Sequence, residues 1–383
     1  MNIQEILSNE ELRQHEFPVT REKTFLSHAA VCALPRRVSD AIRDYATTST
    51  RGDQEVLIPP NLIADTRKLA AQMLNAQPDE IALVGPTSLG LSFVASGIKW
   101  KRGDNILIYF DDYPSNVYPW TALAEKGVQV RFLNIRELGK IRAIDVKGQV
   151  DENTRLVALA SCHFVAGYRI DIPGIGKFLR DRKILFCVDG IQTLGAFPTT
   201  VEHVDFLAAD AHKWLLGPCA AGIFYVRKSA QEILEPTVWG WNNVRCPGYA
   251  AQEQIVFKPG ASRYEAGSEN FFGMIGLKAG MELLLEIGVE NIGRELLRKR
   301  ALLVPALQKK GYTVLQADAP TENASGIVSF FRGETDLTPL HTKLAAANIV
   351  TSLRPERSGK KYIRLSPHFY NTDAELERLL ELI

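Results

Sequence analysis

The sequence predicts an α/β fold built around a mostly parallel sheet of seven strands. Seven short apolar runs lie between Ile81 and Val226, and helical or loop stretches separate most of them. Continuous apolar strands are buried on both faces, which is typical of a parallel sheet covered by helices. The predicted strands are 81–84, 105–110, 129–134, 156–161, 184–188, 206–208 and 222–226.

The chain before this sheet is predicted to be mainly helical. Residues 1–20 are consistent with one short helix and a connector. Pro35 opens a helix that runs to about Tyr45, because proline is well tolerated in a first helical turn. A polar loop over 47–55 and a helix over about 61–75 follow.

The chain after the sheet is predicted to form a second, smaller α/β unit. Residues 228–262 form an excursion expected to cover another part of the molecule, and two long helices follow at about 270–287 and 289–310. We expect three parts: an N-terminal segment 1–20, a large domain 21–265, and a linking helix with a small domain 266–383, against which the N-terminal segment could pack. The small domain is predicted to contain strands 312–315, 327–331, 349–353 and 362–365 and helices 336–347 and 372–383.

Composition excludes several functional classes. The 383 residues are 46% hydrophobic and carry a net charge of +1, which favours a globular protein and gives no support to nucleic-acid or membrane binding. The start of the chain is polar and acidic, so we expect no signal peptide, and no stretch is apolar enough for a bilayer. The five scattered cysteines indicate neither a disulfide framework nor a metal site and fit a reducing, cytoplasmic location.

A lysine and an acid are the central candidates for chemistry. Residues 186–190 are predicted to be a buried strand that ends in Asp189, and Lys213 follows within the run 210–218. A buried acid needs a partner, and a lysine in an apolar surrounding can lose its proton and become a nucleophile. A pyridoxal-phosphate site needs a lysine for the Schiff base and an acid that keeps the pyridine nitrogen protonated. Taken alone, each residue is more typical of an ordinary surface lysine or a helix-capping aspartate, so the rest of the chain must supply the other parts of such a site.

Further polar residues could complete such a site. Thr87 and Ser88 lie where a strand ends and a helix begins, which suits either phosphate binding or a simple N-cap. Tyr113 follows the next strand and could stack on a flat cofactor, although core packing is commoner. Gln192 lies close enough to Asp189 to reach the same ligand, and Ser268 again places a hydroxyl at a predicted helix start.

Two arginines are candidates for binding a substrate. Arg354 and Arg364 lie in or beside predicted strands, and arginine commonly holds a carboxylate by two parallel hydrogen bonds. A surface ion pair is the alternative for each. The substrate side-chain pocket is expected among the loops around His28, Tyr113 and Trp241 and in a partner subunit.

These stretches, in their order and spacing, resemble the class V aminotransferase family, which includes cysteine desulfurases, kynureninase and isopenicillin N epimerase. The resemblance extends from about Phe25 to about Asn371. It implies the aspartate aminotransferase-like fold type I of pyridoxal-phosphate enzymes and a homodimer with shared active sites. Its most specific parts are 188–192, 210–218, 263–268 and 363–368.

The resemblance also implies a role for each candidate residue. Lys213 would carry the cofactor as an internal aldimine, Asp189 would pair with the pyridine nitrogen, and Gln192 would bond the ring hydroxyl. Arg364 would hold the carboxylate of an α-amino acid substrate, with Arg354 as a possible helper. The other cofactor contacts would be Thr87, Ser88, Asp210 and His212 around the phosphate, Ser268 from the other subunit, and Tyr113 in place of the stacking histidine of desulfurases.

Two departures from desulfurases bear on the reaction. Desulfurases carry a cysteine on a mobile loop between the two C-terminal arginine positions, but residues 355–363 contain none, so persulfide chemistry by that route is disfavoured. An asparagine that desulfurases use near the ring is replaced around Phe164, and the sequence leaves open whether His163 or Phe164 contacts the cofactor.

The sequence therefore predicts a homodimeric pyridoxal-phosphate enzyme that acts on an α-amino acid. Aminotransferase or side-chain lyase activity is the first expectation, an epimerase follows, and a desulfurase comes last. A non-catalytic protein with the same fold is the rival of a different class, because a fold alone does not prove activity.

Overall fold

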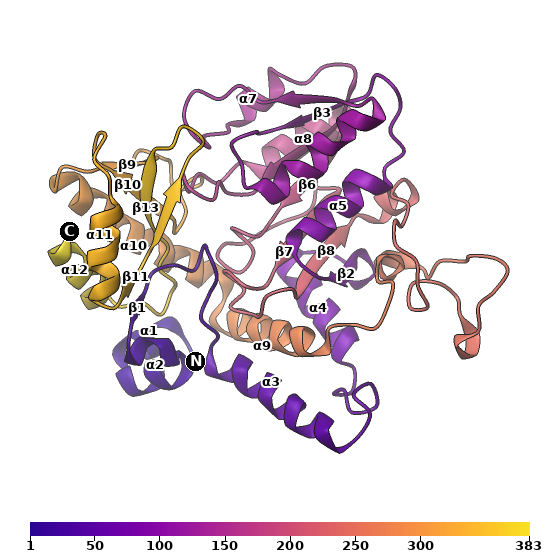
Figure 1. Ribbon diagram of the computed structural model, residues 1–383, viewed down its shortest axis with the longest axis horizontal. Helices are drawn as coiled ribbons and strands as arrows, with labels where there is room; N and C mark the ends of the chain where they lie inside the picture. Colours follow the sequence, from indigo (N-terminus) through magenta and orange to yellow (C-terminus); the bar gives the residue numbers. More distant parts are fainter.

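The computed structural model describes residues 1–383 and contains a large sheet, a smaller C-terminal sheet and a separate pair of short strands (Figure 1). The large sheet has seven strands in the order β2-β8-β7-β6-β5-β3-β4. All neighbouring pairs are parallel except those of β8, which runs antiparallel to both β2 and β7. The strands are β2 Ile81–Val84, β3 Asn105–Ile108, β4 Gln129–Phe132, β5 Thr154–Ala160, β6 Leu185–Asp189, β7 Phe206–Asp210 and β8 Gly222–Val226.

This topology brings the carboxyl ends of six strands to one edge. Strands β3 to β7 are parallel, and β2 has the same direction because two antiparallel steps through β8 restore it. The loops after these strands therefore share an edge, where open α/β sheets commonly bind ligands. The predicted seven-stranded, mostly parallel sheet is confirmed, with strand ends that differ from the predicted ones by one or two residues.

Helices cover both faces of the large sheet, as buried parallel strands require. One apolar cluster packs α5 against the sheet, and the other lies beneath α4, α8 and α9. Helix α9 also contacts α3 and α4. The helices of this part are α3 Arg36–Thr48, α4 Leu62–Leu74, α5 Thr87–Gly97, α6 Tyr118–Thr121, α7 Ala143–Lys147, α8 Ile172–Asp181 and α9 Phe271–Ile287.

The C-terminal part is a four-stranded antiparallel sheet in the order β12-β13-β10-β9, with its own apolar cluster. Helix α10, Val289–Lys309, leads into it from the large sheet (Figure 1). The predicted single strand 349–353 is wrong, because the chain changes partner within it and forms β11 and β12. The other elements are β9 Thr313–Val314, β10 Val328–Phe331, α11 Thr338–Ala346, β11 Ile349–Val350, β12 Ser352–Pro355, β13 Lys361–Leu365 and α12 Asp373–Leu382.

The N-terminal residues pack on the C-terminal part. The predicted single helix in residues 1–20 is wrong, because Asn2 and Asn9 each cap a separate helix, α1 Ile3–Ser8 and α2 Glu10–Glu16. Arg13 pairs with Glu375 at 3.1 Å, and the Phe17 ring stacks on Tyr370 at 4.0 Å.

Residues 24–27 lie with the C-terminal part rather than with the large domain to which the sequence assigned them. Strand β1, Thr24–Phe25, pairs with β11, and Ser27 bridges to Ser366. The chain therefore crosses from the smaller part to the larger one just after these residues.

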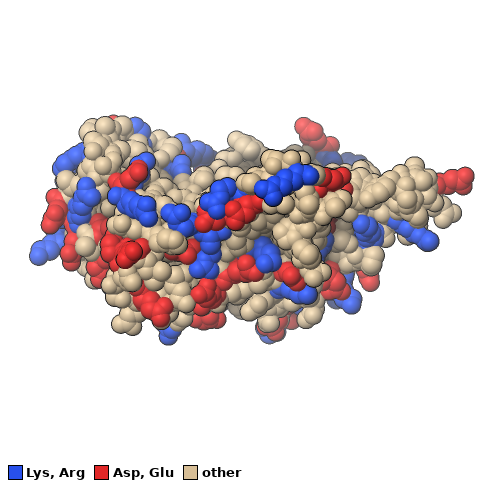
Figure 2. Space-filling view, turned by 90° about the horizontal axis from the view of Figure 1, so that it is seen from below, with Lys and Arg blue, Asp and Glu red and all other residues tan.

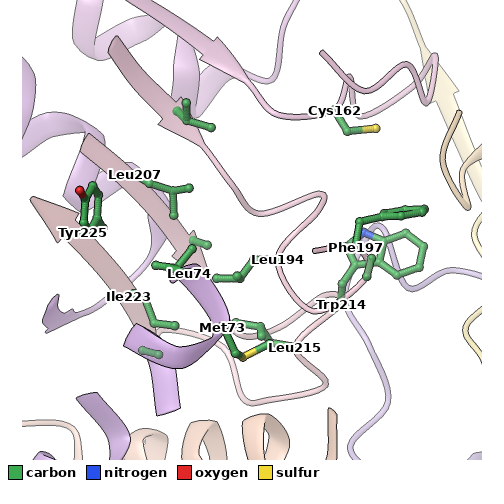
Figure 3. Packing of buried hydrophobic residues seen from close by; sticks show 14 of the residues in the cluster. Met73, Leu74, Cys162, Leu194, Phe197, Leu207, Trp214, Leu215, Ile223 and Tyr225 are labelled. Carbon is green, nitrogen blue, oxygen red and sulfur yellow. The ribbon is translucent and has the colours of Figure 1, made fainter. Parts of the chain in front are cut away.

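The segment that carries Lys213 lies tightly against α9. A Cβ added at Gly280 would lie 2.5 Å from the backbone oxygen of Leu215, and one at Gly276 would lie 2.8 Å from Pro218. The absence of side chains at these α9 positions lets the backbone of residues 215–218 approach the helix. Trp214 and Leu215 are fully buried in the same apolar cluster (Figure 3).

Acidic and basic side chains are interspersed over the face drawn in Figure 2, in keeping with the balanced net charge. No helix combines the length and the apolar character needed to cross a bilayer. A long excursion within residues 239–257 projects from the body at the right of Figure 1.

We expect Gly280→Ala to destabilise the protein by about 1–3 kcal/mol, because the new methyl group would force the Lys213 segment away from α9. The measurement is the free energy of unfolding in denaturant. Gly148→Ala is the matched control, because its Cβ would have only an ordinary contact of 3.4 Å with Ile144. Equal stability of the two variants would contradict the packing argument.

Candidate active site

A cavity of about 300 Å³ lies at the carboxyl edge of the large sheet, where the C-terminal part closes over it. Loops after β2, β3, β5, β6 and β7 contribute to its lining, together with residues 29–31 and the β12–β13 pair. The lining residues are Ala29, Ala30, Val31, Pro86, Thr87, Ser88, Tyr113, Ser115, Phe164, Asp189, Ile191, Gln192, His212, Lys213, Arg354 and Arg364.

Lys213 is the buried amine of this cavity. Lys213 lies on the loop that follows the end of β7, and its Nζ lies 5.2 Å from the centre of the Tyr113 ring. Burial lowers the pKa of Lys213 to about 8; the Asp189 carboxylate opposes that shift, and the charges of Arg364 and Arg354 add to it. More of the amine is therefore neutral near pH 7 than in an ordinary lysine, and the neutral form is the one that a nucleophile or base requires.

Asp189 is the buried acid at the end of β6. One of its oxygens accepts a hydrogen bond from the N–H of Ile191 at 3.0 Å. Burial raises the pKa of Asp189, and the neighbouring Asp112 carboxylate raises it further. A protonated ring nitrogen is the kind of partner that would restore its negative charge, because an opposite charge favours ionisation.

The helix start after β2 forms one wall of the cavity. Thr87 and Ser88 open α5, and the first N–H groups of a helix have no partner within it. The Thr87 hydroxyl accepts a hydrogen bond from the N–H of Asp210 at 2.9 Å, which ties this helix start to the end of β7. Hydroxyl and N–H donors beside His212 suit a phosphate group.

The amide of Gln192 has a defined orientation. The indole N–H of Trp214 donates to the Gln192 Oε1 at 3.0 Å, and Gln192 Nε2 donates to the Ala29 carbonyl at 3.2 Å. One hydrogen of the Nε2 group remains for the cavity. Gln192 therefore presents a donor, which suits an oxygen on a ring.

Arg364 and Arg354 reach the cavity from β13 and β12. Arg364 is 1% exposed and donates from Nη1 to the Phe164 carbonyl at 2.7 Å. The Nε atoms of both arginines are buried without a hydrogen-bond partner. Such groups are costly to leave unpaired, so an anionic ligand is the expected partner.

His28, a predicted substrate-binding residue, does not line the cavity. The imidazole is fully buried, with Nε2 at 2.7 Å from the Tyr370 hydroxyl and Nδ1 at 2.9 Å from the Ser366 carbonyl oxygen. His28 is therefore a packing residue between the N-terminal and C-terminal segments, and its neighbours Ala29 to Val31 line the cavity instead.

Asp210 also lies outside the cavity lining, contrary to its predicted place beside a phosphate. Its carboxylate accepts the N–H groups of Ala211, Ala220 and Ala221, and its Oδ2 lies 3.0 Å from Nδ1 of His212. Its carboxylate therefore lies behind His212, which lines the cavity. Ser268 is exposed, hydrogen bonded to Glu55, and outside the cavity of its own chain.

The choice between His163 and Phe164 is decided by packing. Phe164 lines the cavity and lies 5.4 Å from the Tyr113 ring, whereas His163 is buried with Nε2 at 2.9 Å from the Asp111 carbonyl oxygen. Sequence reasoning missed Ser115 and the backbone of residues 29–31. No pattern marks these residues, since only the fold brings them to the edge.

The residues present fit pyridoxal phosphate. The cavity combines a buried amine, a buried carboxylate, a helix start rich in donors and an aromatic face, which are the four features that the cofactor's aldehyde, ring nitrogen, phosphate and ring require. No group of His, Cys, Asp or Glu side chains in the chain is arranged to hold a metal ion.

Comparisons with known proteins agree with this geometry. The model of the aminotransferase class-V family matches residues 24–379. A probable cysteine desulfurase of Methanothermobacter thermautotrophicus is 27% identical, with 98% of each chain covered. The solved apo cysteine desulfurase of Thermococcus onnurineus NA1 superposes with a TM-score of 0.88 at 25% identity, covering 97% of this chain and 96% of that one.

A second solved structure shares the fold at lower identity. It is the complex of the cystine C–S lyase C-DES with its reaction product cysteine persulfide, with a TM-score of 0.86 and 23% identity, covering 95% of this chain and 98% of that one. The family match over nearly the whole length, together with the site geometry, shows that this chain belongs to the aminotransferase class-V family and is a pyridoxal-phosphate-dependent enzyme of fold type I.

Proposed function

We propose that the enzyme acts on an α-amino acid, either as an aminotransferase or as a side-chain lyase, including one that cleaves a C–S bond. The observation that carries the proposal is one cavity that holds Lys213, Asp189 and Gln192 opposite Arg364. The bound cofactor supplies an electron sink for a negative charge that develops at Cα.

Side chains of the protein bind and orient the substrate and move its α-proton. Arg364 holds the α-carboxylate and so orients the substrate, and the face of Tyr113 lies beside the Lys213 amine. Lys213 in its neutral form takes the α-proton, because its pKa lies close to the working pH. The Asp189 carboxylate would stabilise a positive charge on the ring nitrogen of the cofactor. Gln192 would donate a hydrogen bond to an oxygen on the same ring.

Cleavage of the substrate's side chain by a lyase reaction is also supported by the similarity to proteins that are named as desulfurases and as a C–S lyase. A persulfide-forming desulfurase is less well supported, because no cysteine lines the cavity and the turn 356–360 between β12 and β13 contains none. Epimerisation remains the third candidate.

The partner assignment is part of the proposal. Trp239, Tyr249 and Ile255 are more than half exposed on the projecting excursion, and such side chains commonly mark an interface. We propose a homodimer in which Ser268, which is remote from its own cavity, reaches the phosphate site of the other subunit. The five free cysteines are compatible with the proposed cytoplasmic location.

A panel of amino acids added to the holoenzyme separates the reactions. One equivalent of 2-oxo acid with loss of the visible absorbance indicates transamination, whereas continuous release of 2-oxo acid and ammonia indicates a lyase. Racemised substrate without either product would indicate an epimerase. No response to any amino acid would overturn the proposal.

Lys213→Ala is expected to abolish the visible absorbance of the holoenzyme and the covalent fixation of the cofactor by borohydride, because no other amine lines the cavity. Mass spectrometry of the reduced wild-type protein should locate the cofactor on Lys213. Lys68→Ala, which changes an exposed lysine, is the control and should behave as wild type. Fixation elsewhere in the chain would refute the assignment.

The rate at which the cofactor-free protein takes up pyridoxal phosphate should rise with pH, reach half its maximum at about pH 8 and level off above about pH 9. The rate follows the neutral fraction of Lys213, whose pKa is lowered to about 8 from an ordinary value of 10.5. Asp189→Asn should move the plateau to lower pH, because the Asp189 carboxylate raises the lysine pKa. The measurement is stopped-flow absorbance, and a rate still rising at pH 10 would contradict the shift.

Light scattering is expected to give twice the 42.6 kDa mass of one chain. Ser268→Ala should weaken cofactor binding, and mixing it with Lys213→Ala should restore tight binding at one site of each mixed dimer. That site combines Lys213 of one chain with Ser268 of the other. A monomer, or no restoration after mixing, would contradict shared sites.

A further inference from the structure

Arg354 and Arg364 lie side by side on one face of the small sheet. Strands β12 and β13 are antiparallel, with Ser352 opposite Arg364 and Arg354 opposite Tyr362. Paired residues share a face, and so do residues two apart along a strand, so the two arginines are diagonal neighbours. Both side chains line the cavity.

The chain supplies no anion for either guanidinium. Arg364 donates to the Phe164 carbonyl and, at 3.4 Å, to the Ser352 hydroxyl, both neutral groups, and its Nε has no partner. The Nε of Arg354 is likewise buried and unpartnered. By contrast, Arg357 on the adjoining turn pairs with Asp111 at 2.9 Å.

Two adjacent like charges repel each other. Burial lowers the pKa of Arg364, and the charge of Arg354 lowers it further. The only carboxylate that lines the cavity is Asp189, at the end of β6. A ligand that brings compensating negative charge would therefore stabilise the arginine pair.

The cofactor phosphate is poorly placed to supply that charge. Its proposed site is the start of α5, which follows β2, whereas Arg364 is anchored to the carbonyl of Phe164, which follows β5. In the sheet order, β8, β7 and β6 lie between β2 and β5. The substrate's α-carboxylate can neutralise one arginine, which leaves the charge of the other.

We propose that the substrate is a dicarboxylic α-amino acid, whose α-carboxylate binds Arg364 and whose side-chain carboxylate binds Arg354. The inference rests on the proposed action on an α-amino acid and adds the substrate class. Arg354 thus becomes a specificity-determining residue, because a neutral side chain would leave its buried Nε without a hydrogen-bond partner and its charge without an anion.

The first test titrates the holoenzyme with matched pairs, aspartate against asparagine and glutamate against glutamine, and reads half-saturation from the cofactor's visible spectrum. We expect the acidic member of at least one pair to bind about 10- to 100-fold more tightly, as expected for a charge-assisted pair of hydrogen bonds. Arg354→Gln should reduce that preference to within about threefold.

Two variants serve as controls. Arg354→Lys keeps the charge but not the forked geometry, so it should retain an intermediate preference. Arg357→Gln removes a nearby charge that lies outside the cavity and should leave the preference as in wild type.

A second test needs no reaction. Isothermal titration calorimetry of the holoenzyme with succinate and glutarate, compared with butyrate, measures the arginine pair directly. We expect the dicarboxylates to bind more tightly and to lose that advantage in Arg354→Gln.

The two tests separate the possible failures. Equal binding of aspartate and asparagine, and of glutamate and glutamine, overturns the inference but leaves the proposed function standing. Equal weakening of every amino acid by Arg354→Gln also overturns it, since Arg354 would then serve the α-carboxylate alone. If no amino acid changes the spectrum, the proposed function fails, and the calorimetry still decides whether the pair selects two carboxylates.

Discussion

The burial of Lys213 beside Asp189 is the constraint on which the rest of the site depends. Both side chains are less than a tenth exposed, and burial shifts their pKa values toward the neutral forms. Residual opposite charge on each stabilises the other, so the pair can survive away from water. The close approach of the Lys213 segment to α9 and the tie between Thr87 and Asp210 hold the amine at this place.

The two parts of the fold supply different kinds of residues to the cavity. The large sheet supplies the donors, the acid and the amine at the ends of β2, β6 and β7. The small sheet supplies cationic groups from one hairpin, anchored to the large part by the bond from Arg364 to Phe164. The site is therefore complete only when the two parts are docked, and the N-terminal segment helps to hold them through β1 and Phe17.

The chain departs from the desulfurases it resembles in ways that change the chemistry. The hairpin that would carry a sulfur-accepting thiol is a short turn without a cysteine, and the two arginines that flank it have no carboxylate partner within the chain. A site that lacks a thiol but has excess positive charge is better matched to acidic substrates than to sulfur relay. The shared fold and cofactor are compatible with both, because reaction choice resides in a few side chains.

The sequence alone determined the α/β class, the sheet of seven strands and the cofactor, because apolar runs mark buried strands and the lysine and acid stand at fixed places after them. It also identified most lining residues, including Tyr113, Gln192 and both arginines. Tertiary structure alone decided that His28 packs against Tyr370 and that Asp210 lies behind His212. It also decided that residues 24–27 pair with segments of the C-terminal part, and that Phe164 rather than His163 lines the cavity. These outcomes depend on contacts between residues far apart in the chain, and no local pattern encodes which side of a loop turns inward.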